Sequence, residues 1–545
     1  MDKNISKTVD LASMTREELE AYAMQVSSEK EELAAKVSWY EEQYKLGRAK
    51  RFGPSSEQTP FEQLSLFNEA EAEVYGTMLN EPSLSEVKPP RNLKKKGHKD
   101  KITRPLPTTV IDYKLTGEDT VCSKCGATLQ EMKIEIRREL KVIPAQIQVT
   151  EHVQHVYVCR SCDREGTASN IVYAPMPNPV LRNSLASPSM IAYVMNRKYV
   201  EAIPLYRQEQ QLKKYGLQLS RQTLANWMIK SSEHHLKPLY DLMHRELVSK
   251  TVLHADETVL EVLCEPGRDA TNDSYMWLYR TSGDSVPIVL YDYKPGRSGD
   301  YPKEFLKGFK GFLHTDGYAG YHKLSESKDG KPADVIQVGC WAHARRKWDE
   351  ALKGITDKEG VNAINIQTGL EYCNTLFRLE KELKELSSEE RYVRRIEEAK
   401  PVIEAYFGWI KSMESKVVPK SLIGQAVTYS LNQQKYLVGY LLDGRLEISN
   451  NRAERSIKPL VIGRNNWLFS NTPKGADASA VIYSIVETAK ENNLNPFPYL
   501  EYLFERLPNI DKEDSAVLSK LLPWSESIPE GCRNLAQVSD EAAAN

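Results

Sequence analysis

The stretch T-V-L-H-A-D-E-T-V-L-E-V, residues 251–262, decides the fold of this chain. Apolar and β-branched residues surround a single aspartate, Asp256, and this pattern predicts a buried strand. Because side chains alternate between the two faces of a strand, we expect His254, Asp256 and Thr258 on one face. A buried acid costs free energy unless it has a partner, and a metal ion would be such a partner.

Two further carboxylates stand in settings that favour the same site. Asp316 ends the short apolar run G-F-L-H-T-D, residues 311–316, and Glu454 lies in N-N-R-A-E-R-S-I-K-P, residues 450–459, where Asn and Ser capping residues predict the start of a helix. Two like charges about 4 Å apart repel by roughly 4 kcal/mol at an effective dielectric of 20. Three converging carboxylates therefore predict divalent cations between them, and Mg²⁺ or Mn²⁺ suits oxygen ligands and phosphate.

The choice of the third acid depends on where that helix begins. Asp443 and Glu447 lie close by in the sequence. With Asn450 as the N-cap, Glu454 falls in the first turns of the helix, whereas Glu447 precedes it in a loop or strand. A helix fixes the direction of a ligand, so Glu454 is the expected third acid.

Length and composition set the broad class. The 545 residues are enough for three or four domains, and the net charge of −2 places any DNA contact on local basic patches. No apolar run approaches membrane-spanning length, and the N-terminus lacks a signal-peptide core, so we expect no membrane partner. Eight cysteines, four of them in two C-x-x-C pairs, favour a reducing cytoplasm and one metal site.

The two C-x-x-C pairs form the strongest local motif. Each pair donates two thiolates from a tight turn, and two pairs around a predicted β-hairpin close a tetrahedral Zn²⁺ site. A redox pair is the alternative, although neither pair opens a helix after a strand. Four thiolates leave no open coordination position, so a structural role is expected for Cys122, Cys125, Cys159 and Cys162.

The N-terminal region carries a heptad pattern. Leu19, Val26, Leu33 and Tyr40 recur every seven residues, which predicts a short coiled coil that pairs two copies of the chain. The alternative is one amphipathic helix packed on its own protein. The basic run after it, residues 91–104, is a solvated tether or a non-specific phosphate contact.

Residues 184–236 contain three predicted helices. Gly216 breaks the pattern, and a capped helix from Ser220 gives the spacing of a helix-turn-helix. An ordinary helical hairpin is an equally open reading. In a helix-turn-helix, base-edge contacts come from the start of the second helix, which here carries Arg221, Gln222 and Asn226.

From residue 250 the pattern changes to strands and helices, and it predicts a mixed sheet covered by helices, as in ribonuclease-H-like domains. The fold class is therefore multidomain and mainly α, with a mixed α/β core. The expected regions are 1–50 (coiled-coil helix), 51–106 (linker), 107–175 (zinc-binding β module), 176–248 (helix-turn-helix-like), 249–354 (core, first part), 355–440 (helical insertion), 441–525 (core, second part) and 526–545 (frayed tail).

Motifs along nearly the whole chain resemble the transposases of the insertion-sequence-66 family of bacterial mobile elements. They are the paired C-x-x-C motifs together with R-F-G-P-S-S-E (51–57), I-P-L-Y-R-Q-E-Q (203–210), L-H-A-D-E-T (253–258), D-G-Y-A-G-Y (316–321), G-C-W-A-H-A-R-R-K (339–347), N-N-R-A-E-R-S-I-K-P (450–459) and Y-S-I-V-E-T-A-K (483–490). One departure is Ser449, where the family often has Asp.

The resemblance implies a ribonuclease-H-like core with the acidic triad Asp256, Asp316 and Glu454. It implies hydrolysis at the ends of the element, attack of the freed 3′-hydroxyl on double-stranded target DNA, and two Mg²⁺ ions roughly 3.5–4 Å apart. It also implies a nucleoid-associated place in a bacterial cytoplasm, a homo-oligomer and a role for accessory proteins. Phosphate contacts are expected from Arg345, Arg346, Lys347, Arg455, Lys458 and Arg464, whereas Cys340 and His343 are interpreted as packing residues.

Two alternatives remain open at this point. One is a zinc-containing DNA-binding regulator whose nuclease core is inactive. The other is a nuclease that cuts without strand transfer.

Overall fold

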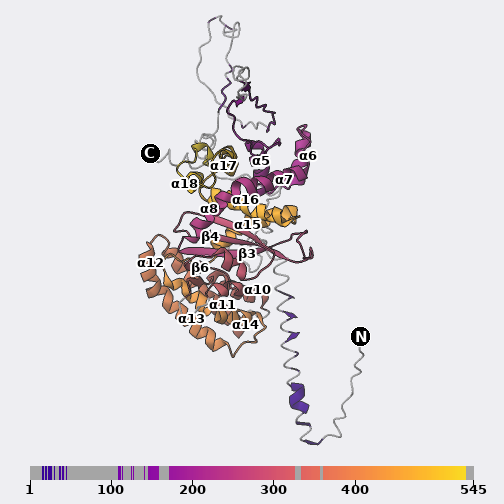
Figure 1. The fold of residues 1–545 in the computed structure, drawn as a ribbon. Coiled ribbons are helices and arrows are strands. Elements are labelled where there is room, and N and C mark those ends of the chain that lie inside the picture. The colour runs from indigo at the N-terminus through magenta and orange to yellow at the C-terminus, as the bar shows by residue number, and fades with distance from the viewer. Residues whose placement is uncertain are drawn as a thin grey trace.

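A five-stranded sheet forms the centre of the computed structural model, which describes residues 145–158, 171–325, 333–355 and 360–534 with scattered positions before residue 145 (Figure 1). The strands are β3 (Val252–Leu260), β4 (Ser274–Thr281), β5 (Val289–Lys294), β6 (Gly311–His314) and β7 (Val335–Val338). The segment around Asp256 that the sequence predicts to be a buried strand is thus β3, the middle strand of the sheet. The mixed sheet expected from the sequence is confirmed.

The strand order is β5-β4-β3-β6-β7. β4 is antiparallel to both β3 and β5, whereas β6 is parallel to β3 and β7 is parallel to β6. The register sets His254 opposite His314. Asp256 and Asp316 follow two residues later on these adjacent parallel strands, so they point from the same face at the same level.

Helices gather on both sides of the sheet (Figure 1). The helices that precede β3 and those that end the chain lie beyond β4, toward β5, and the helices of residues 341–442 lie beyond β6, toward β7. The helices before β3 are α5 (Pro188–Tyr199), α6 (Leu205–Lys214), α7 (Arg221–Ser231), the π-helix η3 (Ser232–Leu236) and α8 (Lys237–Val248). Short elements α9 (Asp300–Phe305) and η4 (Ala319–Leu324) flank β6.

The structure has two apolar cores. The helices on the β7 side build one of them, called the second core below, around Trp341, Trp348 and Tyr406. Trp348 Nε1 donates a 3.0 Å hydrogen bond to the hydroxyl of Tyr406, so the indole N–H of this buried tryptophan is satisfied. The elements are α10 (Trp341–Gly354), α11 (Val361–Glu382), α12 (Ser388–Arg394), η5 (Arg395–Ala399), α13 (Lys400–Met413), α14 (Leu422–Leu437) and η6 (Val438–Leu442).

The chain then returns to the sheet through α15 (Asn451–Trp467) and α16 (Pro473–Glu491). α16 covers the edge strand β5: the N–H groups of Tyr291 and Val289 donate to the hydroxyls of Ser484 at 2.8 Å and Thr488 at 3.0 Å. These bonds satisfy backbone donors that an open edge would expose. The last elements are α17 (Pro496–Arg506), η7 (Leu507–Asn509), α18 (Ser515–Ser519) and η8 (Glu530–Cys532).

The expected frayed tail is wrong for residues 526–534. Ile528 and Cys532 are buried, and the carbonyl of Cys532 accepts a 2.7 Å hydrogen bond from the N–H of Asn495. Apolar side chains in a segment that looks polar by composition dock it onto α17. Residues 535–545 lie outside the described residues.

Only part of the N-terminal expectations can be compared with the structure. Cys122, Cys125, Cys159 and Cys162 lie outside the described residues. Strand β1 (Val156–Val158) pairs antiparallel with β2 (Ile171–Tyr173), which follows the second C-x-x-C pair. The described positions between Arg16 and Lys45 are helical. Within the described residues, none of the helices is long and apolar enough to cross a membrane.

Candidate active site

Asp256 and Asp316 form the centre of the candidate site. Asp256 lies in β3, and its Oδ1 accepts the N–H of Glu257 at 2.9 Å; Asp316 lies just past β6, and its Oδ1 accepts the N–H of Tyr318 at 2.9 Å. The pKa of Asp256 is raised well above its usual range, chiefly by burial and then by the negative charges of Glu257 and Asp316. The two carboxylates thus repel one another across neighbouring strands, and the charge of Arg297 offsets only part of the rise in the pKa of Asp256.

Glu257 lies next to Asp256 but on the opposite face of β3. Its Oε1 accepts hydrogen bonds from Arg297 Nε at 2.9 Å and Nη2 at 2.6 Å, and its Oε2 accepts the hydroxyl of Tyr321 at 2.6 Å. Burial and the charge of Asp316 raise the pKa of Glu257 to about 7, against the lowering effect of Arg297. Both oxygens of Glu257 therefore have protein partners, which distinguishes it from the two aspartates.

Helix α15 lies on the face of the sheet that carries Asp256. Asn450, the residue before its first turn, accepts a 2.9 Å hydrogen bond from His254 Nδ1 and donates a 2.8 Å bond to the carbonyl of Ala255. The predicted N-cap position is confirmed, but its side chain makes no capping bond to the helix. The side chain is used to fasten the helix start to β3.

Glu454 follows in the first turn of α15 and is 6% exposed. Its carboxylate faces Cys340 and His343, and the three ligand atoms lie within 4.8 Å of one another. His343 Nδ1 is 3.8 Å from Glu454 Oε1. Burial raises the pKa of Glu454 to about 8, and Arg455 lowers it slightly; neither aspartate is among the causes. The structure therefore brings Asp256 and Asp316 together and places Glu454 on the same face, turned toward a different pair of side chains.

Glu447 precedes α15, as expected. Its Oε1 accepts a 2.6 Å hydrogen bond from Arg452 Nε, and its carbonyl accepts a 2.6 Å bond from His314 Nε2. Burial raises the pKa of Glu447, but the positive partners, including Arg452, lower it more, so the net direction is downward. This carboxylate is held in an ion pair.

The donor set fits divalent cations in two places. Asp256 and Asp316 offer hard carboxylate oxygens whose mutual repulsion a cation would relieve. Both carboxylate oxygens of Glu454 are buried and accept no hydrogen bond from the residues that the structure describes. Unpartnered buried oxygens of this kind are costly unless an ion or solvent satisfies them.

The predicted phosphate contacts near the site differ in exposure. Arg455 is exposed, and Lys458 and Arg464 are half-buried in α15. Arg346 is 2% exposed in the structure. Of its neighbours in α10, Arg345 donates a 2.7 Å hydrogen bond to Asn374 Oδ1, and Lys347 lies 3.7 Å from Glu350. The face of α10 that carries Arg346 packs inward, whereas Arg345 and Lys347 on its flanks are half-buried.

The helix-turn-helix residues lie at the surface. Ser220 caps α7 by accepting the N–H of Thr223 at 3.2 Å, and Arg221, Gln222 and Asn226 are exposed along the first turns. Gly216, at the break before α7, has a φ of +83°, which a side-chain-bearing residue rarely adopts. The turn and the exposed start of α7 are compatible both with a helix-turn-helix and with an ordinary helical hairpin.

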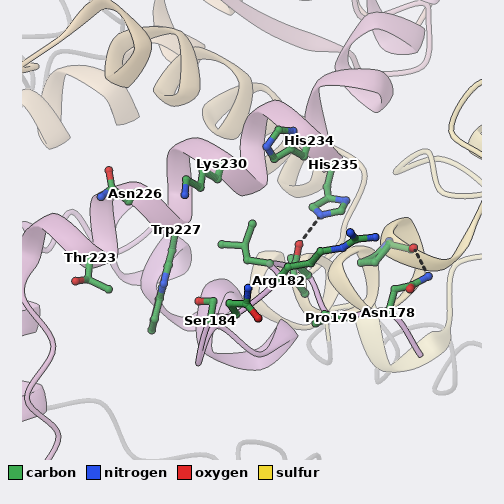
Figure 2. Close-up of a pocket in the computed structure, with 14 residues that line it drawn as sticks. Asn178, Pro179, Arg182, Ser184, Thr223, Asn226, Trp227, Lys230, His234 and His235 are labelled. Atoms are coloured by element: carbon green, nitrogen blue, oxygen red, sulfur yellow. Dashed lines mark hydrogen bonds between the residues drawn. The ribbon is translucent and has the colours of Figure 1, made fainter. Parts of the chain in front are cut away.

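A pocket of about 680 Å³ lies beside α7 (Figure 2). It is formed between the α7–η3 segment and the loop at residues 178–184. His235 closes one wall by donating from Nε2 to the carbonyl of Val180 at 2.8 Å. Basic and amide side chains predominate among its polar lining: Asn178, Arg182, Asn183, Asn226, Lys230 and His234.

From the sequence, Cys340 and His343 could pass for half of a zinc site, but without a second pair they are interpreted as packing residues. Their spacing was a usable signal, because residues three apart at a helix start share one face. What the spacing alone could not give is the carboxylate that meets them, since Glu454 comes from another helix more than a hundred residues away.

Comparisons with known proteins point in one direction. A profile described as "Transposase IS66 family" matches residues 183–478. A "zinc-finger binding domain of transposase IS66" matches residues 119–163, and an "IS66 C-terminal element" matches residues 484–524. The last two flank the first, so the matches run in order along most of the chain.

Curated relatives from Sinorhizobium fredii cover most of the chain. The uncharacterized protein y4hP is 27% identical over 437 residues, which is 78% of this chain and 76% of the relative. The uncharacterized protein y4qI is 30% identical over 418 residues, 75% of this chain and 74% of the relative. The uncharacterized protein y4jD is 27% identical over 420 residues.

Proposed function

Because this chain belongs to the IS66 family of transposases, we propose that it cuts DNA at the ends of a mobile element and joins the freed 3′ ends to target DNA. The observation that carries the proposal is the pair Asp256 and Asp316 on adjacent parallel strands, with Glu454 on the helix fastened beside them. Carboxylates converging on one sheet face suit metal-dependent phosphoryl transfer.

The sheet topology supports a ribonuclease-H-like core. The order β5-β4-β3-β6-β7, with only β4 running against the other strands, places the acids at the middle of the sheet. The helices α11 to α14 lie between α10 and α15, which agrees with the expected insertion at residues 355–440. The proposed division of the chain into regions keeps the boundaries expected from the sequence.

In the proposed reaction, Asp256, Asp316 and Glu454 would hold Mg²⁺ or Mn²⁺. When bound, such ions would activate the attacking oxygen and stabilise the leaving one. Asp256 and Asp316 are held by backbone N–H groups at 2.9 Å, which fixes their direction before DNA binds. Arg297 forms an ion pair with Glu257 on the opposite face of β3, so Glu257 would not compete with Asp256 for a metal ion.

DNA binding is proposed for three regions, which are α7 with the pocket beside it, the zinc module, and the basic residues around the acids. The exposed start of α7, with Arg221, Gln222 and Asn226, would read base edges, and the basic pocket beside it would hold phosphate. The zinc module would bind one structural Zn²⁺ through Cys122, Cys125, Cys159 and Cys162; its match to a zinc-finger family profile supports this. Arg345, Lys347, Arg455, Lys458 and Arg464 would contribute phosphate contacts around the acids.

Self-association is assigned to the N-terminal helix. Its heptad residues are exposed in the single chain: Leu33 is 61% exposed and Tyr40 is 66% exposed. A second copy would cover this apolar stripe and bring two DNA ends together. The resemblance also favours accessory proteins and a nucleoid-associated place in the bacterial cytoplasm.

The alternative of a regulator with an inactive core predicts DNA binding without cutting. The test uses purified full-length protein, DNA carrying the ends of the element, and Mg²⁺. We expect cleavage and joining by the wild type, and neither by Asp256→Asn, while both proteins bind the ends equally. Binding without cutting by the wild type would favour the regulator, and cutting without joining would favour a simple nuclease.

A further inference from the structure

The cluster of Cys340, His343 and Glu454 contains three different metal-binding side chains in one buried place. We propose that it is a second metal site, distinct from the four-cysteine module, and that it takes a borderline divalent ion such as Zn²⁺. Nothing in the proposed DNA chemistry requires a thiolate or an imidazole at this position.

The ligand set selects the metal. A thiolate and an imidazole favour Zn²⁺ or Co²⁺ over Mg²⁺, whereas a carboxylate accepts all of them. In a tetrahedral Zn²⁺ site, bonds of about 2.0–2.3 Å separate ligand atoms by roughly 3.4–3.6 Å. The 3.8 Å between His343 Nδ1 and Glu454 Oε1 is close to that spacing, and all three ligand atoms lie within 4.8 Å of one another, so a small inward movement would complete the site. Three protein ligands leave a fourth position for water.

His343 and Glu454 contribute polar atoms that have no other partner in the described part of the chain. His343 Nδ1 and both carboxylate oxygens of Glu454 are buried without a hydrogen-bond partner among the described residues. Each of the two residues is 6% exposed, and Cys340 is 0% exposed. Buried polar atoms are normally satisfied, so three unsatisfied atoms pointing at one another indicate something that binds between them.

The surroundings of Cys340 suit a bound thiolate. Its sulfur accepts the backbone N–H of Asn450 at 3.1 Å. Cys340 is also the N-cap residue of α10, where the positive end of the helix dipole favours negative charge. N–H groups directed at sulfur are the outer contacts that orient a metal-bound thiolate.

The site lies where the chain leaves and re-enters the sheet. Cys340 and His343 stand at the start of α10, and Glu454 stands in the first turn of α15. The N–H of Trp341 donates a 3.1 Å hydrogen bond to the carbonyl of Ile448, which brings these two points together. An ion here would fasten the base of the whole α11–α14 segment.

The second site would also share Glu454 with the proposed magnesium site. This consequence rests on the proposed function: one oxygen of Glu454 would bind the ion beside Cys340 and His343, and the other would remain for the ions at Asp256 and Asp316. Metal binding itself does not depend on the proposed function, so it is tested by metal content and not by DNA cleavage.

The test measures zinc in full-length protein purified under reducing conditions and dialysed against metal-free buffer. We expect about two zinc ions per wild-type chain and about one in Cys340→Ser, His343→Ala and Cys122→Ser. The matched control is Cys373→Ser, which alters another fully buried cysteine and should retain two. After cobalt exchange, the spectrum of the wild type minus that of Cys340→Ser should show the near-ultraviolet band of a single thiolate bound to Co²⁺.

Equal zinc content in the wild type, Cys340→Ser and His343→Ala would overturn the proposal. So would one zinc per wild-type chain that is lost in Cys122→Ser. Circular dichroism checks that each variant is folded. If Cys340→Ser fails to fold, the near-isosteric Glu454→Gln carries the test, and retention of two tightly bound zinc ions in that variant would count against the site.

Discussion

His254 and Asn450, which are 196 residues apart in the sequence, are joined by a 2.9 Å hydrogen bond between the imidazole Nδ1 and the amide Oδ1. The same amide donates to the carbonyl of Ala255, and Asn450 is fully buried. Asn450 thereby sets the position of α15 on β3, and with it the position of Glu454 one turn later. It acts as a positioning residue for the acids.

Asn450→Ala should slow DNA cleavage by at least tenfold without weakening DNA binding. The substitution leaves His254 and the Ala255 carbonyl unpaired, at about 1–3 kcal/mol for each buried group. Because Glu454 would lose its fixed position, we also expect a higher Mg²⁺ concentration for half-maximal rate. Asn466→Ala removes an amide near the end of the same helix and is the control. An unchanged Mg²⁺ dependence in Asn450→Ala would show a purely structural role.

Glu454→Gln should abolish Mg²⁺-dependent cleavage and retain binding to the element ends, whereas Glu447→Gln should retain most activity. Glu447 is held in an ion pair with Arg452, whereas neither oxygen of Glu454 accepts a hydrogen bond from the described part of the chain. Single-turnover cleavage assays with matched protein concentrations provide the measurement. A fully active Glu454→Gln together with an inactive Glu447→Gln would show that the third acid has been assigned to the wrong residue.

Lowering the pH should destabilise the packing around His235. Burial is the main cause that lowers the pKa of His235 below 6.5, and Lys512, whose Nζ lies 3.5 Å from Nδ1, lowers it further. The unfolded chain therefore binds the proton more tightly than the folded one. The stability contribution is complete above about pH 6.5 and declines as the pH falls through the lower, folded-state pKa.

Thermal unfolding midpoints measured between pH 7.5 and pH 5 test this expectation. His235→Gln keeps a donor for the Val180 carbonyl, so it should fold and show a weaker pH dependence than the wild type. The exposed His152 provides the control, because it is not among the groups that act on His235 and His152→Gln should leave the pH dependence unchanged. Identical slopes in all three proteins would exclude His235 as a source of acid sensitivity.

Asn226→Ala should weaken binding to the element ends by about 10- to 100-fold, because one bidentate base contact is worth about 1–3 kcal/mol. Binding to unrelated DNA should change little. Fluorescence anisotropy at fixed salt gives both affinities. Asn362→Ala, an exposed asparagine at the start of α11, is the matched control. Equal losses on both DNAs would favour an ordinary helical hairpin over a sequence-reading helix.

Deletion of residues 1–46 should reduce self-association, since it removes the exposed heptad stripe that contains Leu33 and Tyr40. Light scattering over a range of concentrations measures the molar mass of both proteins. If the deletion and the full chain show the same mass, the N-terminal helix does not pair two copies.

The sheet and the start of α15 could be predicted because each depends on local pattern. The run around Asp256 alternates as a buried strand should, and Asn450 marks the start of a helix by its residue type. The family resemblance, now confirmed, also rested on runs of contiguous residues. These features are encoded within a dozen residues of sequence.

Other features could not be predicted because they depend on contacts between distant segments. Arg346 stands in a basic run that looks exposed, yet the side of α10 that carries it packs against the second core. The direction of the Glu454 side chain depends on Cys340 and His343, which belong to another helix. Asn450 has the residue type of a helix cap, but its side-chain oxygen accepts a hydrogen bond from His254 in β3 and caps no N–H of the helix.

The long segment between β3 and α15 also affects the order in which the protein is made. At about 5–20 residues per second, α15 leaves the ribosome roughly 10–40 s after β3. A nascent chain therefore displays both aspartates well before it has Glu454, and α5 to α8 are complete earlier still. Products of premature termination would lack Glu454 and also α16 and α17, which pack against α5 and α7. The proposed DNA-binding helices therefore lose their packing partners together with the third acid, so a damaged gene copy would yield neither cutting nor a stable competing fragment.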